Sequence, residues 1–370
     1  MATLTAPCQS SSTQLTLRFP EHYELKGELG KGGEATIELW GHKQGLRTYP
    51  YLAIKCIKAK ARGGYHREVE VLRLLGKHKS VIELFFWTRE CPRPGVDCLV
   101  FPAYPEGDLH TLHRRRAQYN KGIFAEAFLW GVYAQLSEAL SFLHEGIGAA
   151  RRNDNRRTII HRDIKMENIL VETLGHNPDL SSIKIKLADF GLADSYDPRR
   201  PSRMRDFWGT PLYWPPEQTF CDPISTPEGD VWAIGAIVHR LAHSFPPTTS
   251  HFITKQNFLA KHSAPRYPSY TDSMMEFYWE ATTPRQVYPV NLEQQQQLLE
   301  GTRRLRWTPR YTDRLNNHLM LSLQMQQAAR APAGLLHRRV EEGRAVFEHD
   351  QREAATQAVA EELVNNWALS

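Results

Sequence analysis

The sequence predicts an α+β protein made of a small β-rich lobe followed by a larger, mainly helical lobe. Short apolar or alternating runs broken by Gly and Pro fill the region from Tyr23 to about Val100, as expected of strands. After about Asp108 the apolar residues recur at helical spacing instead. The length of 370 residues also exceeds what one compact core usually contains, which favours two lobes.

The β-rich lobe, assigned to residues 21–102, contains one segment of a different kind. Residues 66–78 place Val69, Leu72 and Leu75 at helical spacing, so a single helix is expected among the strands. The segments expected to form strands are 35–40, 51–57, 81–87 and 97–101.

The helical lobe, assigned to residues 103–340, has its strongest helical patterns at 124–145 and 229–245. Polar interruptions predict loops. The charged stretch 151–157 is interpreted as a solvated surface loop, and 174–182 as a turn between two strands.

Both ends of the chain differ from the two lobes. Residues 1–20 are rich in Ser and Thr and predict a flexible arm. Residues 341–370 predict an amphipathic helical tail with Val359, Leu363 and Trp367 on one face. We expect this face to pack on the helical lobe rather than to bind a partner.

Composition is that of an ordinary globular protein, with 41% hydrophobic and 24% charged residues. The net charge of +5 is spread along the chain and predicts neither nucleic-acid nor membrane binding. Five cysteines without zinc-site spacing fit a reducing compartment. No secretory signal or membrane-spanning run is visible, so an intracellular protein of the cytoplasm or nucleus, not a secreted one, is expected.

Three features near the N-terminus are ambiguous when taken singly. The Gly-rich turn from Leu29 to Ile37 lets backbone N–H groups approach phosphate oxygens, but an ordinary hairpin has the same composition. Lys55 lies in an apolar strand and points either into a cleft or to solvent. Glu68, in the lone helix, is either its buried counter-charge or a surface glutamate.

Motifs further along the chain decide between these interpretations. A polar cluster bounded by apolar residues spans 160–170 and contains His161-Arg162-Asp163 and Asn168. It is followed in order by the segments Asp189-Phe190-Gly191, Gly209-Thr210-Pro211, Pro215-Pro216-Glu217 and Asp230-Val231-Trp232. Each motif is fallible alone, but their order and spacing are very specific.

The chain resembles a eukaryotic protein kinase of the Ser/Thr type from about Tyr23 to Val340. The resemblance implies a bilobal kinase fold in which the lone helix is regulatory. It also implies transfer of the γ-phosphate of Mg-ATP to protein Ser and Thr hydroxyls, with ATP and Mg²⁺ as cofactors.

The resemblance implies a role for each motif residue. Lys55 would bind the α- and β-phosphates and pair with Glu68. Asp189 and Asn168 would bind magnesium. The loop covering the phosphates would contain Leu29, Gly30, Lys31, Gly32 and Gly33.

The phosphate acceptor is expected at the 160–170 cluster. Asp163 would accept the hydroxyl proton of the substrate, and Lys165 would face the γ-phosphate. Lys165 and Thr210 are what Ser/Thr kinases have at these places. Glu217 is expected to pair with Arg330 and brace the large lobe.

The adenine pocket follows from the same resemblance. Phe101 would be the gatekeeper, and Tyr104 would complete the adenine contacts through its backbone. Pro102 departs from the usual acidic residue, but this position offers only a carbonyl. Asp108 would accept from the ribose, and the base would lie between Ile37, Ala53 and Leu170.

Three departures bear on whether the enzyme is active. Ala35 replaces a glycine of the loop, Pro215 replaces an alanine and Met166 replaces a common proline. None is a metal ligand, the lysine or the base, so an active enzyme is favoured over a pseudokinase scaffold or regulator that binds ATP without turnover.

The activation segment predicts independence from an activating kinase. Arg162 corresponds to the arginine that binds a phosphothreonine in similar kinases, and Asp206 falls where that threonine is expected. We therefore expect Asp206 to mimic the phosphate; the alternative is a solvated aspartate in a loop. Ser202, preceded by two arginines, is a candidate phosphorylation site, and Thr210 completes the regulatory candidates of this segment.

The expected partners are protein substrates with Ser or Thr. Glu106, Asp108 and Glu167 would favour basic residues before the target serine. A small-molecule kinase is disfavoured because such kinases generally lack this activation segment. A nucleic-acid-binding protein is disfavoured because no aromatic platform accompanies the basic runs. The oligomeric state is left open.

Overall fold

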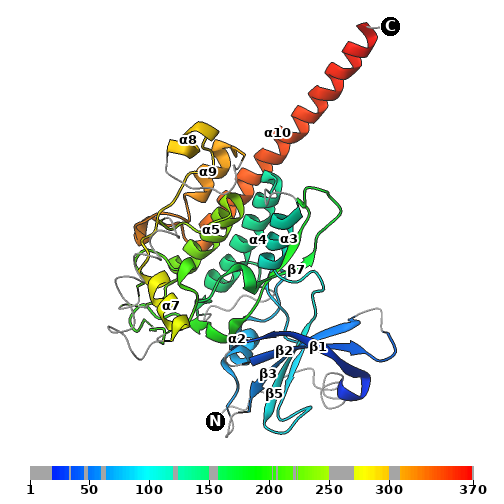
Figure 1. The fold of residues 1–370 in the computed structure, drawn as a ribbon, viewed down its shortest axis with the longest axis vertical. Coiled ribbons are helices and arrows are strands. Elements are labelled where there is room, and N and C mark those ends of the chain that lie inside the picture. The colour runs from blue at the N-terminus through cyan, green and yellow to red at the C-terminus, as the bar shows by residue number, and fades with distance from the viewer. Residues whose placement is uncertain are drawn as a thin grey trace. The chain divides into compact units, whose positions relative to one another are not determined.

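The computed structural model contains two compact units (Figure 1). Unit 1 comprises residues 1–105 with 188–191, and unit 2 comprises 106–187 with 192–370. The structure describes residues 19–32, 35–45, 49–59, 64–119, 124–149, 157–201, 203–205, 207–219, 222, 224–249, 271–299 and 309–368.

In its described residues, unit 1 contains a five-stranded antiparallel sheet of order β1-β2-β3-β5-β4, a short helical stretch at 19–22 and helix α2 (Arg67–Leu75). The strands are β1 (Tyr23–Lys31), β2 (Ala35–His42), β3 (Tyr51–Lys58), β4 (Phe86–Thr88) and β5 (Val96–Pro102). The sheet and helix α2, which lies between β3 and β4 in the sequence, confirm the predicted β-rich lobe, and unit 2 confirms the mainly helical one.

Two strands differ from the prediction. The run 81–87 is a strand only from Phe86, because Val81 and Ile82 are buried in a loop, and an apolar run alone cannot distinguish a strand from another buried segment. Strand β1 was not predicted because all but its first residue are exposed, which leaves no alternation of apolar and polar residues.

The register divides the sheet into two faces. Residues paired across antiparallel strands share a face, so Ile37, Lys55 and Leu99 lie together, and two residues along each strand Leu39, Ala53 and Phe101 continue the same face. The opposite face forms a compact apolar core of Phe19, Tyr23, Trp40, Leu52, Ile54, Cys56, Cys98 and Val100.

Phe19 corrects the boundary drawn for the N-terminal arm. It was placed in the arm 1–20, but its ring is 1% exposed and packs edge-on against Trp40 at 5.4 Å. Burying an aromatic side chain stabilises the fold by about 1.5–3 kcal/mol, which fixes this end of the chain to the sheet. The rest of the predicted arm, residues 1–18, lies outside the described residues.

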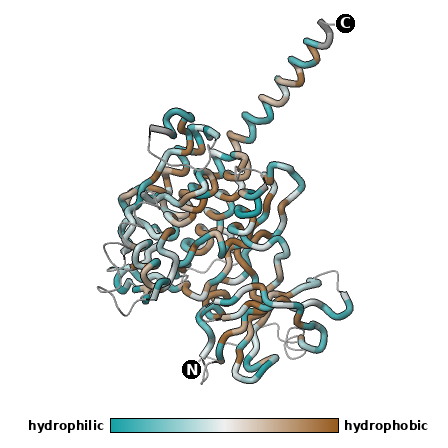
Figure 2. The backbone as a smooth tube through the Cα atoms, in the orientation of Figure 1, coloured by the Kyte–Doolittle hydropathy of each residue, from teal (hydrophilic) through white to brown (hydrophobic). Residues whose placement is uncertain are grey.

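Unit 2 is built around two buried helices, α4 (Glu126–Glu145) and α5 (Pro227–His243), which confirm the predicted helical segments. Most residues of both helices are buried, as expected of helices surrounded by other helices, and Figure 2 shows brown segments alternating with paler and teal ones in this lobe. The other helices in the described part of unit 2 are α3 (Leu109–Tyr119), α7 (Asp272–Thr282), α8 (Gln294–Leu299), α9 (Asp313–Leu319) and α10 (Ala333–Ala368).

Short strands and 3₁₀ turns place the polar motifs. Strands β7 (Ile169–Thr173) and β8 (Lys184–Leu187) pair antiparallel, which confirms the turn predicted at 174–182. Strand β6 (Ile159–Ile160) pairs with β9 (Asp194–Ser195). The 3₁₀ turns are η1 (Met166–Asn168), η2 (Phe190–Leu192), η3 (Pro211–Tyr213) and η4 (Gln327–Ala329). Most of the charged stretch 151–157 lies outside the described residues.

The C-terminal tail is helical, as predicted, but it does not pack as expected. Val359 and Leu363 are 58% and 61% exposed, so the interpretation that they pack on the helical lobe is wrong. Helix α10 is anchored by its first half, where Val340 and Phe347 are buried. At 3.6 residues per turn, Leu363 lies about 160° around the axis from Phe347, so the distal apolar face points away from the anchored one.

Candidate active site

Unit 1 joins Lys55, Glu68 and Asp189 in one charge network. The Nζ of Lys55, on β3, donates to Glu68 Oε2 at 2.6 Å and to Asp189 Oδ1 at 2.7 Å. The second oxygen of Glu68 accepts the backbone N–H of Phe190 at 3.2 Å. A residue of α2 therefore connects the lysine on the sheet to the Asp189-Phe190-Gly191 motif, as the sequence predicts for Lys55 and Glu68.

The neighbouring carboxylates favour the charged form of Lys55. Burial disfavours a charged Lys55, but attraction to Glu68 and Asp189 outweighs it and raises the pKa of the lysine above its usual value. Burial raises the pKa of Glu68, while Lys55 acts to lower it. The short contacts to the ammonium group support a lysine that is charged at neutral pH.

Backbone conformation around Asp189 is specialised. Asp189 has φ of +63°, which is uncommon for a residue with a side chain and occurs mostly at functional sites. A Cβ on Gly191 would lie 3.2 Å from Asp189 Oδ1 and 3.7 Å from Lys55 Nζ. A glycine here therefore leaves space beside the two charged groups.

The Gly-rich turn is a hairpin between β1 and β2. Gly32 N–H donates to the carbonyl of Ala35 at 2.8 Å and closes the turn. Apart from its two chain neighbours, no atom of the residues that the structure describes lies within 4 Å of a Cβ built on Gly30, so contacts with these residues do not require a glycine here. A backbone without side chains beside open space suits the close approach of phosphate oxygens. Gly33 lies outside the described residues, and Leu29 is exposed.

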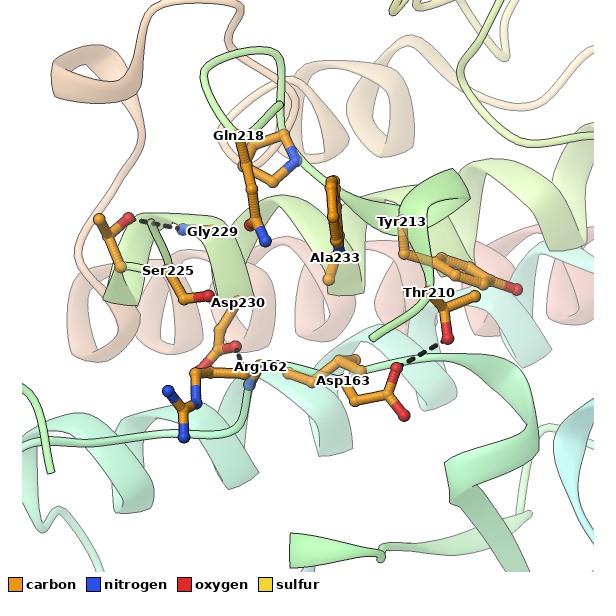
Figure 3. Close-up of a pocket in the computed structure, with 13 residues that line it drawn as sticks. Arg162, Asp163, Thr210, Tyr213, Gln218, Ser225, Gly229, Asp230 and Ala233 are labelled. Carbon is orange, nitrogen blue, oxygen red and sulfur yellow. Dashed lines mark hydrogen bonds between the residues drawn. The ribbon is translucent and has the colours of Figure 1, made fainter. Parts of the chain in front are cut away.

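Unit 2 assembles the acidic centre of the site from 163–168 and Thr210 (Figure 3). Thr210 Oγ1 donates to Asp163 Oδ1 at 2.7 Å. Lys165 Nζ lies 2.8 Å from Asp163 Oδ2 and donates to Thr210 Oγ1 at 3.1 Å. Asn168 Nδ2 donates to the backbone carbonyl of Asp163 at 2.8 Å and to its Oδ2 at 3.2 Å. The carboxylate is buried and fully oriented by these neighbours.

Asp230, at the start of α5, fixes the backbone of this loop. Its carboxylate accepts the N–H of His161 at 2.7 Å and that of Arg162 at 3.0 Å, and it lies 3.1 Å from His144 Nε2. Arg162 has φ of +71°, so these bonds hold a turn that its own preference opposes. In the sequence, Asp230 is recognisable only as part of the motif Asp230-Val231-Trp232. An acidic residue within an otherwise apolar helical segment was the sequence signal that could have identified Asp230 as a structural residue.

The side chain of Arg162 contacts Leu192 and Asp194 within unit 2. Its Nε donates to the carbonyl of Leu192, and its guanidinium lies 3.5 Å from Asp194 Oδ2. Asp206 and Ser202, its expected neighbours in the activation segment, lie outside the described residues.

The residues expected around adenine divide between the two units. In unit 1, Phe101 is buried and pairs with Ala53 across β3 and β5, on the same face as Ile37 and Lys55. Pro102 pairs with Leu52 at the end of β5. Tyr104 follows the strand and is partly exposed.

In unit 2, Asp108 and Leu170 form a β-bridge. Asp108 Oδ1 accepts the N–H of Thr111 at 2.6 Å and so caps helix α3. A carboxylate oriented in this way still has acceptor capacity for a further donor, such as a hydroxyl.

Two buried arginines brace the region after Thr210. Arg330 donates to both oxygens of Glu217 at 2.6 and 2.7 Å, which confirms the predicted pair, and its side chain is fully buried. Arg285 was not predicted, because the segment around it matched the kinase pattern poorly. It donates to the carbonyls of Pro211, Trp214 and Thr283 at 2.5–2.7 Å, and burial lowers its pKa to about 10.

Comparison with known families decides what this arrangement is. The model of the protein kinase domain matches residues 23–318, about four-fifths of the chain. The chain belongs to the protein kinase domain family. Within the described part of this kinase domain, no helix is long and apolar enough to cross a membrane.

Three curated protein kinases are similar in sequence to this kinase domain. It is 29% identical over 232 residues to the calcium/calmodulin-dependent protein kinase type II of Caenorhabditis elegans, covering 62% of this chain and 28% of the relative. It is 31% identical over 184 residues to the mouse serine/threonine-protein kinase Nek2, covering 50% and 37%. The serine/threonine-protein kinase PLK4 of Drosophila sechellia is 30% identical over 234 residues, covering 61% and 26%. The chain thus spans little more than a third of these relatives at most.

A solved structure agrees on the fold. A chain from the CAK complex of Chaetomium thermophilum bound to ATP-γ-S aligns with a TM-score of 0.58 and 24% sequence identity. The alignment covers 89% of this chain and 93% of that chain. This likeness supports the kinase fold for almost the whole sequence.

Proposed function

We propose that this kinase domain is an active serine/threonine protein kinase that transfers the γ-phosphate of ATP to protein hydroxyls. The observation that carries the proposal is the oriented carboxylate of Asp163, which already accepts a hydroxyl hydrogen bond from Thr210 at 2.7 Å. A carboxylate that is buried and oriented toward a hydroxyl donor is suited to accept the proton of a substrate Ser or Thr. Membership of the kinase family and the names of its relatives support the same activity.

Positioning and charge neutralisation account for the rest of the reaction. Phosphoryl transfer requires in-line placement and stabilisation of charge on the transferred group. Lys165, 2.8 Å from Asp163, supplies a cation where the γ-phosphate would approach the hydroxyl. Lys55 supplies a second cation for the α- and β-phosphates, held ready by Glu68.

We propose that the nucleotide is bound by the sheet face that carries Lys55. Ile37, Ala53 and Phe101 share that face and offer apolar contact to the adenine ring. The backbone after β5, at Pro102 and Tyr104, would supply the polar contacts to the base. Leu170 would complete the apolar contact, and Asp108 would accept from the ribose. The hairpin residues Leu29, Gly30, Lys31, Gly32 and Gly33 would cover the phosphates.

The oxygen donors fit magnesium. Asp189 engages Lys55 through Oδ1 and has a second carboxylate oxygen, and Asn168 donates through its amide nitrogen, which leaves its amide oxygen as the donor atom for a cation. Magnesium is usually bound by one or two such side chains together with substrate phosphates. When bound, it neutralises charge on the phosphates of the nucleotide.

Transfer of labelled γ-phosphate to a mixed protein substrate tests the proposal. The purified chain is compared with Asp163→Asn and with a control variant, Asp179→Asn, whose carboxylate lies in the β7–β8 turn. We expect transfer by the parent and the control and its loss in Asp163→Asn. Nucleotide binding without transfer by the parent would instead indicate a pseudokinase regulator.

We further propose that Asp206 replaces an activating phosphate. Arg162 is held near the catalytic loop by Leu192 and Asp194, and a nearby carboxylate would give its guanidinium an additional acceptor. Unmodified protein is therefore expected to be active without an upstream kinase, and Asp206→Ala to lower that activity. Unchanged activity of Asp206→Ala would exclude this role.

Substrate choice and self-modification follow from charge. Glu167 lies 3.2 Å from His110 and, with Glu106 and Asp108, would attract basic residues that precede a target serine. Ser202, preceded by Arg199 and Arg200, matches that preference. A phosphopeptide map of protein incubated with ATP is expected to include phosphorylated Ser202, and its absence would exclude autophosphorylation there.

A further inference from the structure

Two cysteines of unit 1 face each other across neighbouring strands. Cys56 on β3 and Cys98 on β5 are direct partners in the antiparallel register, and their Sγ atoms lie 3.6 Å apart. A disulfide requires an Sγ–Sγ distance of about 2.05 Å and Cβ atoms about 3.5–4.5 Å apart. Paired residues of adjacent strands have Cβ atoms about 4.5–5.5 Å apart. A small movement of the two strands therefore brings these thiols to bonding distance.

The two thiols differ in access. Cys98 is fully buried, whereas Cys56, 7% exposed, lies in the wall of an open cavity of about 510 Å³. This cavity is on the face of the sheet opposite Lys55, because consecutive residues of a strand point to opposite faces. Its lining includes the cationic side chains Lys31, Lys58 and Arg93. A small polar oxidant can therefore reach Cys56 but not Cys98.

Arg93 makes Cys56 the more reactive of the pair. Its guanidinium Nη2 lies 3.7 Å from Cys56 Sγ and is itself held by Glu38 at 2.5 Å. A neighbouring guanidinium stabilises a thiolate, which is the nucleophilic form of cysteine. The hydrogen bond with Cys98 lowers the pKa of the Cys56 thiol, and Arg93 acts in the same direction, while burial and Glu38 oppose both. The pKa of Cys98 is raised by its hydrogen bond to Cys56 and by burial.

We propose that Cys56 and Cys98 form a redox site at which hydroperoxides produce a reversible disulfide between β3 and β5. The Cys56 thiolate attacks the terminal oxygen of the hydroperoxide, the O–O bond breaks, and Cys56 becomes a sulfenic acid while an alcohol or water leaves. Cys98 then attacks the Cys56 sulfur, and its proton leaves with the hydroxyl group as water. The two electrons lost by the two thiols reduce the peroxide bond, so the exchange balances.

The geometry assigns one role to each cysteine. Cys56 reacts first because it borders the cavity and contacts the guanidinium, and Cys98 resolves the sulfenic acid because it is already 3.6 Å away. Fast resolution by a neighbouring thiol protects a sulfenic acid from irreversible oxidation. Neither thiol belongs to the Lys55 network or to the catalytic loop, so the thiol chemistry itself needs no step of phosphoryl transfer.

Peptide mapping of the oxidised full chain tests the proposal. Reduced protein is treated with hydrogen peroxide, blocked with a thiol alkylator and digested. We expect a cross-linked peptide pair joining Cys56 to Cys98, with the loss of two hydrogen atoms, that disappears on treatment with dithiothreitol. The free thiols of the chain would then fall by two from the five in the sequence.

Variants separate the two roles. In Cys98→Ser, the sulfenic acid at Cys56 has no resolving partner and is expected to be labelled by dimedone. Cys91→Ser is the matched control, because Cys91 packs against the same core but lies outside the pair, and its disulfide yield should equal that of the parent. Arg93→Ala should slow oxidation several-fold, and Arg93→Lys should restore most of the rate.

Three results would overturn the inference. One is a parent protein in which Cys56 stays reduced at peroxide concentrations that oxidise a free cysteine peptide. Another is a disulfide that joins Cys56 or Cys98 to a different cysteine. The last is direct conversion of Cys56 to sulfinic acid in the parent with no disulfide, which would mean that Cys98 does not resolve it.

Discussion

Lys55 and Asp163 both present a charge in the candidate site, but their surroundings differ. Lys55 is held by two carboxylates, one on helix α2 and one 134 residues away along the chain. Asp163 is oriented by its own neighbours Lys165 and Asn168, with Thr210 as the only distant partner among the contacts described above. The lysine therefore depends on where one helix and one distant motif lie, whereas the aspartate is positioned mainly by its own loop.

This difference suggests which contacts would change if the activity of the site is regulated. A shift of α2 would remove Glu68 and leave Lys55 with an altered charge environment, because the two belong to separate elements. The conformation of the loop at 163–168 is more constrained. Asp230 fixes the backbone of His161 and Arg162, the two residues that precede it. We infer that the lysine network is the adjustable half of the site and the aspartate loop the fixed half.

Asp163→Asn should have the largest effect on activity. An amide retains the shape of the side chain but cannot accept the substrate proton, so phosphoryl transfer should fall on the order of 10²–10⁴-fold. Nucleotide affinity, measured by calorimetry, should stay near that of the parent. A comparable loss of nucleotide affinity would show that the two halves of the site are not separable.

Asp230→Ala should test how rigidly the loop is held. The substitution leaves two buried N–H groups without their acceptor, at a cost of about 1–3 kcal/mol each in the free energy of unfolding. Denaturant titration measures this loss, and Asp230→Asn, which retains one acceptor oxygen, should recover part of it. Equal stability of Asp230→Ala and the parent would mean that the loop does not need this carboxylate.

Glu68→Gln should test the adjustable half. It replaces an ion pair by a hydrogen bond from the Lys55 ammonium to a neutral amide oxygen, with an expected loss of about 1 kcal/mol of interaction with Lys55. Activity should fall, and the KM for ATP should rise, while Asp189 continues to hold the lysine. Glu70→Gln on the same helix is the matched control, because Glu70 is exposed. Equal kinetics for both variants would exclude a role for Glu68.

Thr210→Val should have the smallest effect of the four. It removes the hydrogen bond to Asp163 and the one that Thr210 accepts from Lys165, each worth on the order of 1 kcal/mol, while the Lys165–Asp163 ion pair remains. We expect a modest decrease in kcat that Thr210→Ser, which retains the hydroxyl, restores. A loss as large as that of Asp163→Asn would show that the orientation of Asp163 depends mainly on Thr210.

Much of this arrangement could be predicted from residue patterns, with instructive exceptions. Helix α2 and the buried helices α4 and α5 followed from apolar spacing, and the pairing of Glu217 with Arg330 followed from the kinase resemblance. Strand β1 was missed because its exposed residues carry no alternation. Arg285 was missed because its partners are backbone carbonyls, which leave no trace in the sequence.

The C-terminal tail shows a second limit of prediction from the sequence. The helical periodicity of 341–370 correctly indicated a helix, yet it gave no information on which apolar face is anchored. Phe347 packs near Trp130 of α4, with ring centroids 6.3 Å apart, while Val359 and Leu363 remain exposed. Amphipathicity predicts that a face can be buried, but the neighbouring elements decide which one is.

The sequence by itself determined the element types and the identity of the motif residues, because periodicity and side-chain chemistry are local properties. Only the tertiary structure decided that Glu68 and Asp189 meet at one ammonium group, and that Arg285 holds the backbone after Thr210. It also decided that Cys56 and Cys98 face each other. These contacts join residues far apart along the chain, and their geometry is fixed by strand register and packing, which no single segment contains.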